Sequence, residues 1–182
     1  GTFDLFDPYK KIMKKLLSAL IILVVLQASC QPSKKKTNNT INQLELEPVE
    51  IESQDGHKRA YFASGCFWCV EAVYESVIGV KESISGYSGG HTDYPTYEES
   101  NTGKTGHAEA VEIIYDPEII SFKLLVDVYF GSQNISQING QGNDRGSQYR
   151  SIIFYQNAEE KNIINNKIES LYQEKPNRTV AA

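Results

Sequence analysis

The most informative stretch of the chain is Arg59-Ala60-Tyr61-Phe62-Ala63-Ser64-Gly65-Cys66-Phe67-Trp68-Cys69. Its first part, residues 59–64, holds apolar and aromatic side chains, which predict a short strand, and Gly65 predicts the turn that ends it. From Cys66 to about Val77, apolar side chains recur at spacings of three and four, which predicts a helix with one apolar face. The ordered domain is therefore expected to begin with a strand, a turn and a helix that starts at a cysteine.

Cys66 stands at the predicted start of this helix. Cysteine reacts as the thiolate, and the first turn of a helix favours negative charge through its unpaired backbone N–H groups and the positive end of the macrodipole. Cys66 is therefore the candidate nucleophile, and Cys69 repeats the thiol three residues later. A pair of thiols in this arrangement predicts a redox site.

Beyond this helix, the sequence predicts three more strands and two more helices. The strands are expected at residues 80–87, 107–115 and 148–155, and the helices begin after the N-cap candidates Ser121 and Asn157. The order strand-helix-strand-strand-helix-strand-helix predicts an α+β fold, a ferredoxin-like βαββαβ plait. We expect a two-layer sandwich of a sheet and helices with an added C-terminal helix.

The composition limits the class of protein. The chain has 182 residues, of which 40% are hydrophobic, and this suits one packed domain with appendages. Its net charge of -5 gives no basic surplus of the kind that a phosphate-binding groove needs. Nucleic acid is therefore not an expected partner.

The N-terminal residues resemble an export signal. Lysines precede an apolar run over residues 16–26, which is shorter than the ~20 residues that a membrane-spanning helix needs, and small residues then lead to Cys30. The pattern resembles a bacterial lipoprotein signal, in which the cysteine is lipidated after cleavage; an ordinary cleaved signal is the alternative. We expect upstream residues and a signal over 1–30, a flexible polar tether over 31–57 and the folded domain over 58–182. The protein would be exported and held on a membrane through Cys30, facing the periplasm or the cell exterior.

Glu109 is the candidate proton donor. It shares one face of the predicted strand 107–115 with Val111 and Ile113, so its carboxyl group is expected beside apolar surface. Burial raises the pKa of a carboxyl group, which would keep Glu109 protonated near neutral pH. A thiolate next to a neutral carboxylic acid makes a workable pair of nucleophile and acid.

Several further motifs accompany the Gly65-Cys66-Phe67-Trp68 run. They are Gly86-Tyr87-Ser88-Gly89-Gly90, Pro95-Thr96-Tyr97, Gly103-Lys104-Thr105-Gly106-His107-Ala108-Glu109, Tyr115-Asp116-Pro117 and Gln141-Gly142-Asn143-Asp144-Arg145-Gly146-Ser147-Gln148-Tyr149-Arg150-Ser151. In sequence and spacing these motifs resemble the peptide methionine sulfoxide reductase A family over about residues 59–173. Members usually continue past the last helix with an aromatic, acidic and His-containing stretch, so a chain that stops at Ala182 is expected to be truncated.

The resemblance implies a substrate, methionine S-sulfoxide, either free or in an oxidised protein. Cys66 would attack the sulfoxide sulfur, and Glu109 would supply a proton to the sulfoxide oxygen. By the same resemblance, Tyr97 and Tyr149 would hydrogen-bond that oxygen, and Asp144 would help to order the site.

The resemblance also implies a pocket for the substrate. Phe67 and Trp68 would enclose its methyl group, because sulfur and methyl contacts with aromatic rings are favourable. Methionine would leave, and Cys66 would remain as a sulfenic acid. The reaction is expected to need no bound cofactor and no metal, only an external thioredoxin-like protein or another dithiol as reductant.

The resolving thiol is where the sequence departs from much of the family. Many members carry a resolving cysteine near the C-terminus or in the loop after the Pro-Thr-Tyr motif, but Asn101 occupies that loop here. Cys69 is the remaining thiol of the predicted domain. We hypothesise that Cys69 resolves the sulfenic acid and that a thioredoxin-like donor then reduces the disulfide.

Without the resemblance, other interpretations stay open. Cys66 and Cys69 would also suit a structural disulfide or half of a zinc site, although a second Cys pair is missing and the histidines lack a paired spacing. The competing function is a membrane-tethered thiol–disulfide exchanger, which uses a CxxC pair but needs no proton donor and no methyl pocket. A binding module without catalytic activity is the third possible function.

Overall fold

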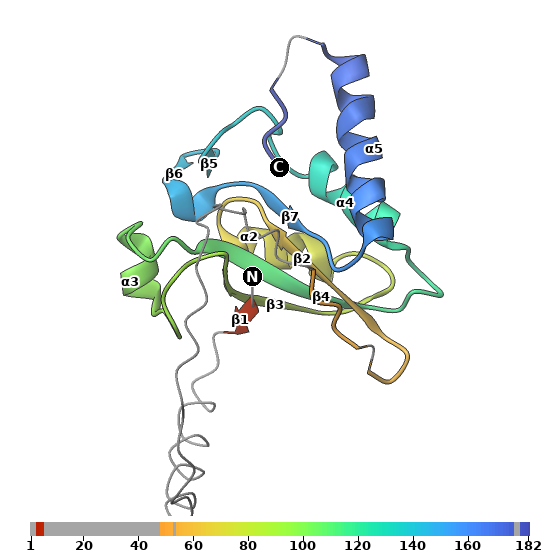
Figure 1. Cartoon of the computed structure of the whole chain (residues 1–182), viewed down its shortest axis with the longest axis horizontal. Coiled ribbons are helices and arrows are strands. Elements are labelled where there is room, and N and C mark those ends of the chain that lie inside the picture. Colours follow the sequence, from red (N-terminus) through yellow and green to blue (C-terminus); the bar gives the residue numbers. More distant parts are fainter. Residues whose placement is uncertain (1–2, 6–47, 53, 177–178) are drawn as a thin grey trace, which may run out of the picture. The chain divides into compact units, whose positions relative to one another are not determined.

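The computed structural model describes residues 3–5, 48–52, 54–176 and 179–182 (Figure 1). Apart from the short strand β1 (Phe3–Leu5), the predicted signal lies outside the described residues, as do Cys30 and most of the predicted tether. In the part of the chain that the structure describes, no helix combines the length and the apolar character needed to cross a bilayer.

The main sheet has five strands, and every pair in it is antiparallel. The strands are β1, β2 (Lys58–Ala63), β3 (Val80–Ser88), β4 (Ala108–Tyr115) and β7 (Ile152–Phe154), in the spatial order β1-β3-β4-β2-β7. A separate hairpin pairs β5 (Gly140–Gln141) with β6 (Asp144–Arg145). The central strand, β4, is therefore held on both sides, by β2 and by β3.

The longer helices pack on one face of the main sheet. They are α2 (Phe67–Glu75), α4 (Phe122–Gly131) and α5 (Ala158–Glu174), while α3 (Tyr97–Asn101) and the 3-10 turn η1 (Ser147–Tyr149) are shorter. Phe62 of β2 is fully buried, and its ring stacks on that of Tyr74 of α2, with 5.1 Å between the ring centroids. Leu125 of α4 and Ile164 of α5 belong to the same core cluster. The α+β class is therefore confirmed, with an antiparallel sheet covered by helices (Figure 1).

Side chains alternate along β4, and this alternation positions the site. Val111 and Ile113 lie in the core between the sheet and the helices, so Glu109, two residues earlier, points to the same side. Ala108 and Ala110 belong to a second buried cluster, with Ala63 of β2. The strand thus directs the carboxyl group of Glu109 into the layer that α2 covers.

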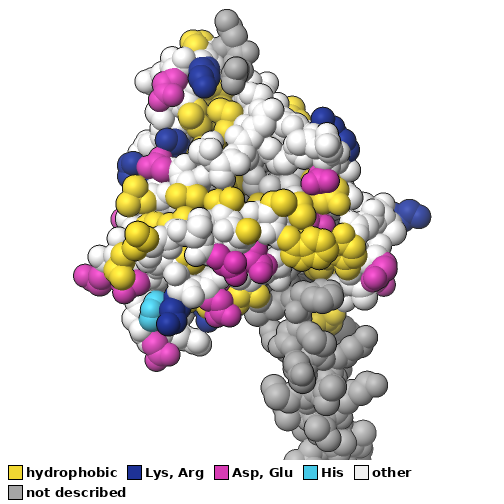
Figure 2. All heavy atoms as spheres, turned by 180° about the vertical axis from the view of Figure 1, so that it is seen from behind, with side chains coloured by type: hydrophobic (Ala, Val, Ile, Leu, Met, Phe, Trp, Pro, Cys, Tyr) yellow, Lys and Arg dark blue, Asp and Glu magenta, His cyan; other side chains and the backbone are white. Residues whose placement is uncertain are grey.

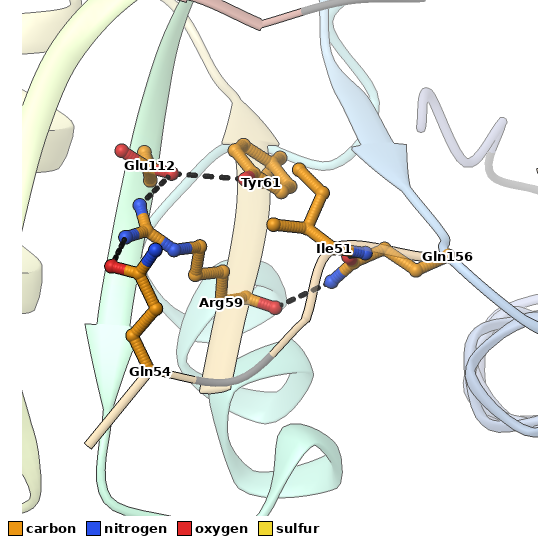
Figure 3. A network of polar contacts seen from close by, with 6 residues as sticks. All are labelled: Ile51, Gln54, Arg59, Tyr61, Glu112 and Gln156. Carbon is orange, nitrogen blue, oxygen red and sulfur yellow. Dashed lines mark hydrogen bonds and ion pairs between the residues drawn. The ribbon is translucent and has the colours of Figure 1, made fainter. Parts of the chain in front are cut away.

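A polar network ties residues before β2 to the domain (Figure 3). The Arg59 guanidinium forms an ion pair with Glu112, at 2.5 Å between Nη1 and Oε1, and the Tyr61 hydroxyl donates to the same carboxyl oxygen at 2.9 Å. The Ile51 N–H donates to Gln156 Oε1 at 2.8 Å, and Gln156 Nε2 donates to the Arg59 carbonyl at 2.6 Å. Part of the predicted tether therefore bonds directly to the domain, and the boundary at residue 57 stays a prediction.

The surface mixes side chains of all kinds. Figure 2 shows Asp and Glu side chains between groups of hydrophobic ones, with Lys and Arg mainly at the margins of that face.

Most predicted elements match the structure, and the differences have local causes. The first helix begins one residue after Cys66, which is its N-cap, and it ends at Glu75 rather than near Val77. The last predicted strand begins later than residue 148, because Gly146, at φ +135°, leads into the turn η1 instead. Strand β1, which pairs with β3 although residues 1–30 were expected to lie outside the fold, was not predicted, nor were the hairpin of β5 and β6 and the short helix α3.

Candidate active site

Cys66 lies at the junction between β2 and α2. Its backbone is extended (φ -61°, ψ 118°), and its carbonyl accepts from the backbone N–H groups of Cys69 and Val70, which opens the helix. The turn before it requires glycine, since Gly65 has φ +78° and a Cβ there would lie 2.6 Å from Cβ of Gln141. A substitution at Gly65 would therefore move the nucleophile.

The Cys66 thiol is half-buried, and this sets its charge state. Burial raises its pKa, while the backbone N–H groups of Cys69 and Trp68 lower it less strongly. The N–H groups at the helix start do favour the thiolate, as expected, but desolvation outweighs them and the net shift of the Cys66 pKa is upward. The charge of the exposed Cys69 side chain and a hydrogen bond with it raise the Cys66 pKa further, so the two side chains are in contact. Neither cysteine forms a disulfide.

Glu109 lies on β4, and its carboxyl group reaches the first residue of α2, next to Cys66 in the chain. Its side chain is only 2% exposed, and its Oε2 accepts a hydrogen bond of 3.0 Å from the backbone N–H of Phe67, the residue after Cys66. Burial raises the pKa of Glu109 to about 7; the Phe67 N–H opposes this shift, and the charge of Asp144 adds to it. The predicted burial and raised pKa of Glu109 are confirmed.

Three aromatic rings form a platform beside these groups, called here the aromatic platform: Phe67, Trp68 and Tyr97. The Tyr97 ring stacks on both others, with centroids 6.3 Å from Phe67 and 5.5 Å from Trp68. Phe67 is 4% exposed and Trp68 58%, so the platform runs from the core out to solvent. Tyr97 is held there because α3 begins with a capping box formed by Thr96 and Glu99.

Tyr149, on η1, is linked to the helix that carries Tyr97. Its hydroxyl donates to Asn101 Oδ1 at 3.5 Å, which links η1 to α3. Burial raises the pKa of Tyr149, and further increases come from the charges of Glu109, Asp144, Tyr97 and Cys66. The structure thus brings together all the predicted site residues that it describes, from β4, α2, α3, β6 and η1.

Two residues to which the sequence analysis gave no role support the site. Tyr87 pairs with Glu109 across β3 and β4, is 1% exposed and packs its ring 5.5 Å from that of Phe67. Arg150 donates to the carbonyls of Ser147 (2.8 Å) and Gly106 (3.0 Å), which joins η1 to the loop before β4. In the sequence, the only sign of a role was that Tyr87 and Arg150 lie within the quoted motifs. The strand register is what shows that Tyr87 lies opposite Glu109.

The described residues offer no metal centre. Among them, no group of three or more His, Cys, Asp and Glu side chains is placed to hold a metal ion. The chemistry that the arrangement allows rests on a thiol, a second thiol in contact with it, and a buried acid of high pKa.

Fold and site together define a domain that sets a cysteine thiol beside a neutral carboxylic acid and an apolar aromatic platform. The sequence profile of the peptide methionine sulfoxide reductase family matches residues 58–181. The chain belongs to this family.

Relatives named "Peptide methionine sulfoxide reductase MsrA" agree with this assignment. The protein of Pasteurella multocida is 49% identical over 114 residues, covering 63% of this chain and 66% of that protein. The protein of Polynucleobacter asymbioticus is 46% identical over 118 residues, covering 65% and 62%. The chain therefore spans slightly less than two thirds of the length of these relatives.

Solved structures share the fold. Methionine sulfoxide reductase A of Corynebacterium diphtheriae matches with a TM-score of 0.61 and 33% identity, covering 69% of this chain and 63% of that one. Reduced Mxr1 from Saccharomyces cerevisiae matches with a TM-score of 0.62 and 26% identity, covering 70% and 75%.

The raised pKa of Glu109 predicts a pH-dependent stability difference. The folded protein holds this proton up to about pH 7, whereas the unfolded chain releases it near 4.5, so Glu109 costs stability as the pH rises through that window. Relative to wild type, Glu109→Gln should gain about 3 kcal/mol in the free energy of unfolding between about pH 4 and pH 8. Urea unfolding of both proteins across this range measures the difference.

Glu82→Gln is the matched control, since Glu82 is an exposed glutamate on β3. It should show no such trend. A Glu109→Gln difference that stays flat with pH would mean that the carboxyl group titrates normally.

Proposed function

We propose that this chain reduces methionine S-sulfoxide, free or within proteins, to methionine. The observation that carries the proposal is the buried carboxyl group of Glu109, with a pKa of about 7, bonded to the N–H of the residue after Cys66. Reduction of a sulfoxide needs a proton donor at its oxygen and a sulfur nucleophile at its sulfur, and this site supplies both. The printed names of the relatives support the same activity.

In the first step, the sulfur of Cys66 attacks the sulfoxide sulfur while protonated Glu109 donates to the sulfoxide oxygen. The oxygen passes to Cys66, the S–O bond of the substrate breaks, and Glu109 recovers a proton from the thiol. The products are methionine and a sulfenic acid on Cys66, so the thiol is oxidised as the substrate is reduced. A thiol of raised pKa suits this step, because it still carries the proton that Glu109 needs back.

The remaining site residues bind and orient the substrate. We assign the hydroxyl groups of Tyr97 and Tyr149 to hydrogen bonds with the sulfoxide oxygen. The substrate methyl group would rest on Phe67 and Trp68, where the aromatic platform offers apolar contact. Asp144 keeps the proton on Glu109 through its negative charge.

Recovery of the enzyme uses the second thiol. Cys69 attacks the sulfenic sulfur, water leaves, and a Cys66–Cys69 disulfide forms; an external dithiol then reduces this disulfide. The contact between the two side chains supports this step. A thioredoxin-like protein is the proposed donor, because Cys69 is exposed where a protein can reach it.

Two further assignments belong to this proposal. The antiparallel order β3-β4-β2-β7, with α2 and α4 between strands along the chain, supports a ferredoxin-like plait. Export with a lipid on Cys30 rests on the apolar run 16–26 and on the small residues before the cysteine.

The stereochemistry of the substrate tests the activity. With dithiothreitol as reductant, wild type should turn over the S diastereomer of a methionine sulfoxide peptide and leave the R diastereomer. Glu109→Gln should lower kcat by about 10²- to 10⁴-fold, since it removes the proton donor. Its reduction of a small disulfide should stay near the wild-type rate, as should both activities of Glu82→Gln. Preference for R, or an unchanged kcat in Glu109→Gln, would refute the proposal. Reduction of the disulfide without any turnover of sulfoxide would favour a disulfide exchanger.

Cys69→Ser tests the recovery step. Without reductant it should still form one methionine per protein and leave a sulfenic acid on Cys66, which dimedone traps. Steady-state turnover with a thioredoxin-like donor should fall by about tenfold or more, because no disulfide forms for the donor to reduce. Turnover with dithiothreitol, which reduces a sulfenic acid directly, is the control and should persist. Full turnover with the protein donor would remove Cys69 from the mechanism.

Mass spectrometry of the protein extracted from membranes tests the anchor. The expected species begins at Cys30 and carries the mass of lipid. Cys30→Ser should release the protein from the membrane fraction, whereas an unmodified N-terminus in the membrane-extracted protein would contradict lipidation.

A further inference from the structure

Gln133 lies just beyond the C-terminal end of α4, outside the residues that the proposed reaction uses. Its amide oxygen accepts hydrogen bonds from three side chains: from Ser151 Oγ at 3.0 Å, from Gln141 Nε2 at 3.1 Å and from Ser64 Oγ. These donors are 18, 8 and 69 residues away along the chain. One oxygen atom therefore joins three segments that the sequence keeps apart.

Each of these segments carries part of the site. Ser64 precedes the Gly65–Cys66 turn, Gln141 ends the first strand of the hairpin that carries Asp144, and Ser151 follows η1 with Tyr149. The amide of Gln133 is thus hydrogen-bonded to the segments that carry Cys66, Asp144 and Tyr149.

The contacts around Gln133 reinforce this link. The Gln141 side chain also bonds the backbone of Asn134 in both directions, accepting from its N–H and donating to its carbonyl, each at 3.0 Å. Cβ and Cγ of the same Gln141 lie against Gly65. The Tyr129 hydroxyl donates to the Ala63 carbonyl at 3.0 Å, so a hydrogen bond also joins α4 to the end of β2.

The surroundings of Gln133 call for an acceptor. All three neighbours donate to the same atom, Oε1 of Gln133. A glutamate at this place would also accept all three bonds, because a carboxylate is an acceptor at both oxygens. A methionine has nearly the same length but offers only a weak acceptor, so it would leave the three donors without a strong one.

We propose that Gln133 is a positioning residue for the reaction: its amide oxygen holds the Cys66 turn, the Asp144 hairpin and the Tyr149 turn at the spacing that attack on a sulfoxide needs. This inference rests on the proposed function. Its physical reason is that a displacement of about 1 Å between reacting groups can cost about 10²-fold in rate.

Three variants test it. Gln133→Met should lower kcat for the S-sulfoxide about tenfold or more, and Gln133→Glu should keep it within about threefold of wild type, because the acceptor is retained. Gln137→Met is the matched control: Gln137 is a half-buried glutamine of the same loop whose side chain donates at 3.2 Å to Gly142, within the hairpin connection. It should keep the wild-type kcat.

A second measurement needs no sulfoxide. In a Cys69→Ser background, the pH midpoint for alkylation of Cys66 by iodoacetamide, followed on its own peptide, reports the hold on the Cys66 turn. Gln133→Met should raise this midpoint, since a loosened turn weakens the backbone N–H groups that lower the pKa of Cys66. Gln133→Glu should move it less than Gln133→Met does.

The outcomes separate the two proposals. Wild-type kcat in Gln133→Met, an unmoved alkylation midpoint, or an equal loss of kcat in Gln133→Met and Gln133→Glu would overturn the positioning role. A wild-type protein that reduces no sulfoxide would refute the proposed function by itself, because the alkylation midpoints would still show whether Gln133 holds the turn.

Discussion

The hydrogen bond from the Phe67 N–H to the Glu109 carboxyl group joins the centre of the sheet to the start of α2. A helix leaves its first N–H groups without partners, and here a buried acid takes one of them. Because β4 is paired on both sides, the carboxyl group has little freedom to follow the helix if the helix moves. The position of the acid relative to the start of α2 is thus fixed from a strand that is hydrogen-bonded on both sides.

This geometry makes charge costly. Glu109 and Cys66 both sit where burial raises the pKa, so the resting site favours two protonated groups over an ion pair. In the proposed reaction the proton that Glu109 donates and the proton that it recovers from Cys66 are therefore both held in the site before attack. A neutral resting thiol is also a slower target for oxidants, because the thiolate is the reactive form.

The sequence predicts the parts of the molecule that repeat a pattern. Alternation along β4 predicts that Glu109 faces the core, and the turn at Gly65 predicts the helix start. The hairpin of β5 and β6 could not be predicted, because strands of two residues leave no periodic signal. The sign of the pKa shift of Cys66 was missed for a different reason: burial depends on the segments packed around the helix start.

Supporting residues are the least visible in the sequence. Tyr87 acquires its place only through the register that sets it opposite Glu109, and Gln133 through partners as far as 69 residues away. Motif spacing indicates which side chains meet the substrate. It carries no information on which atoms keep those side chains apart at the right distance.

The two thiols differ in exposure: Cys66 is half-buried and Cys69 faces solvent, with the exposed indole of Trp68 between them along the chain. In the proposed cycle this difference in exposure separates the substrate from the electron donor. The small sulfoxide group reaches Cys66, whereas the larger electron donor needs to reach only the exposed sulfur of Cys69, where thiol–disulfide exchange takes place. In that cycle the oxidised substrate and the protein that supplies electrons would contact adjacent but different sulfur atoms, so that access for a large electron donor does not require Cys66 itself to be exposed.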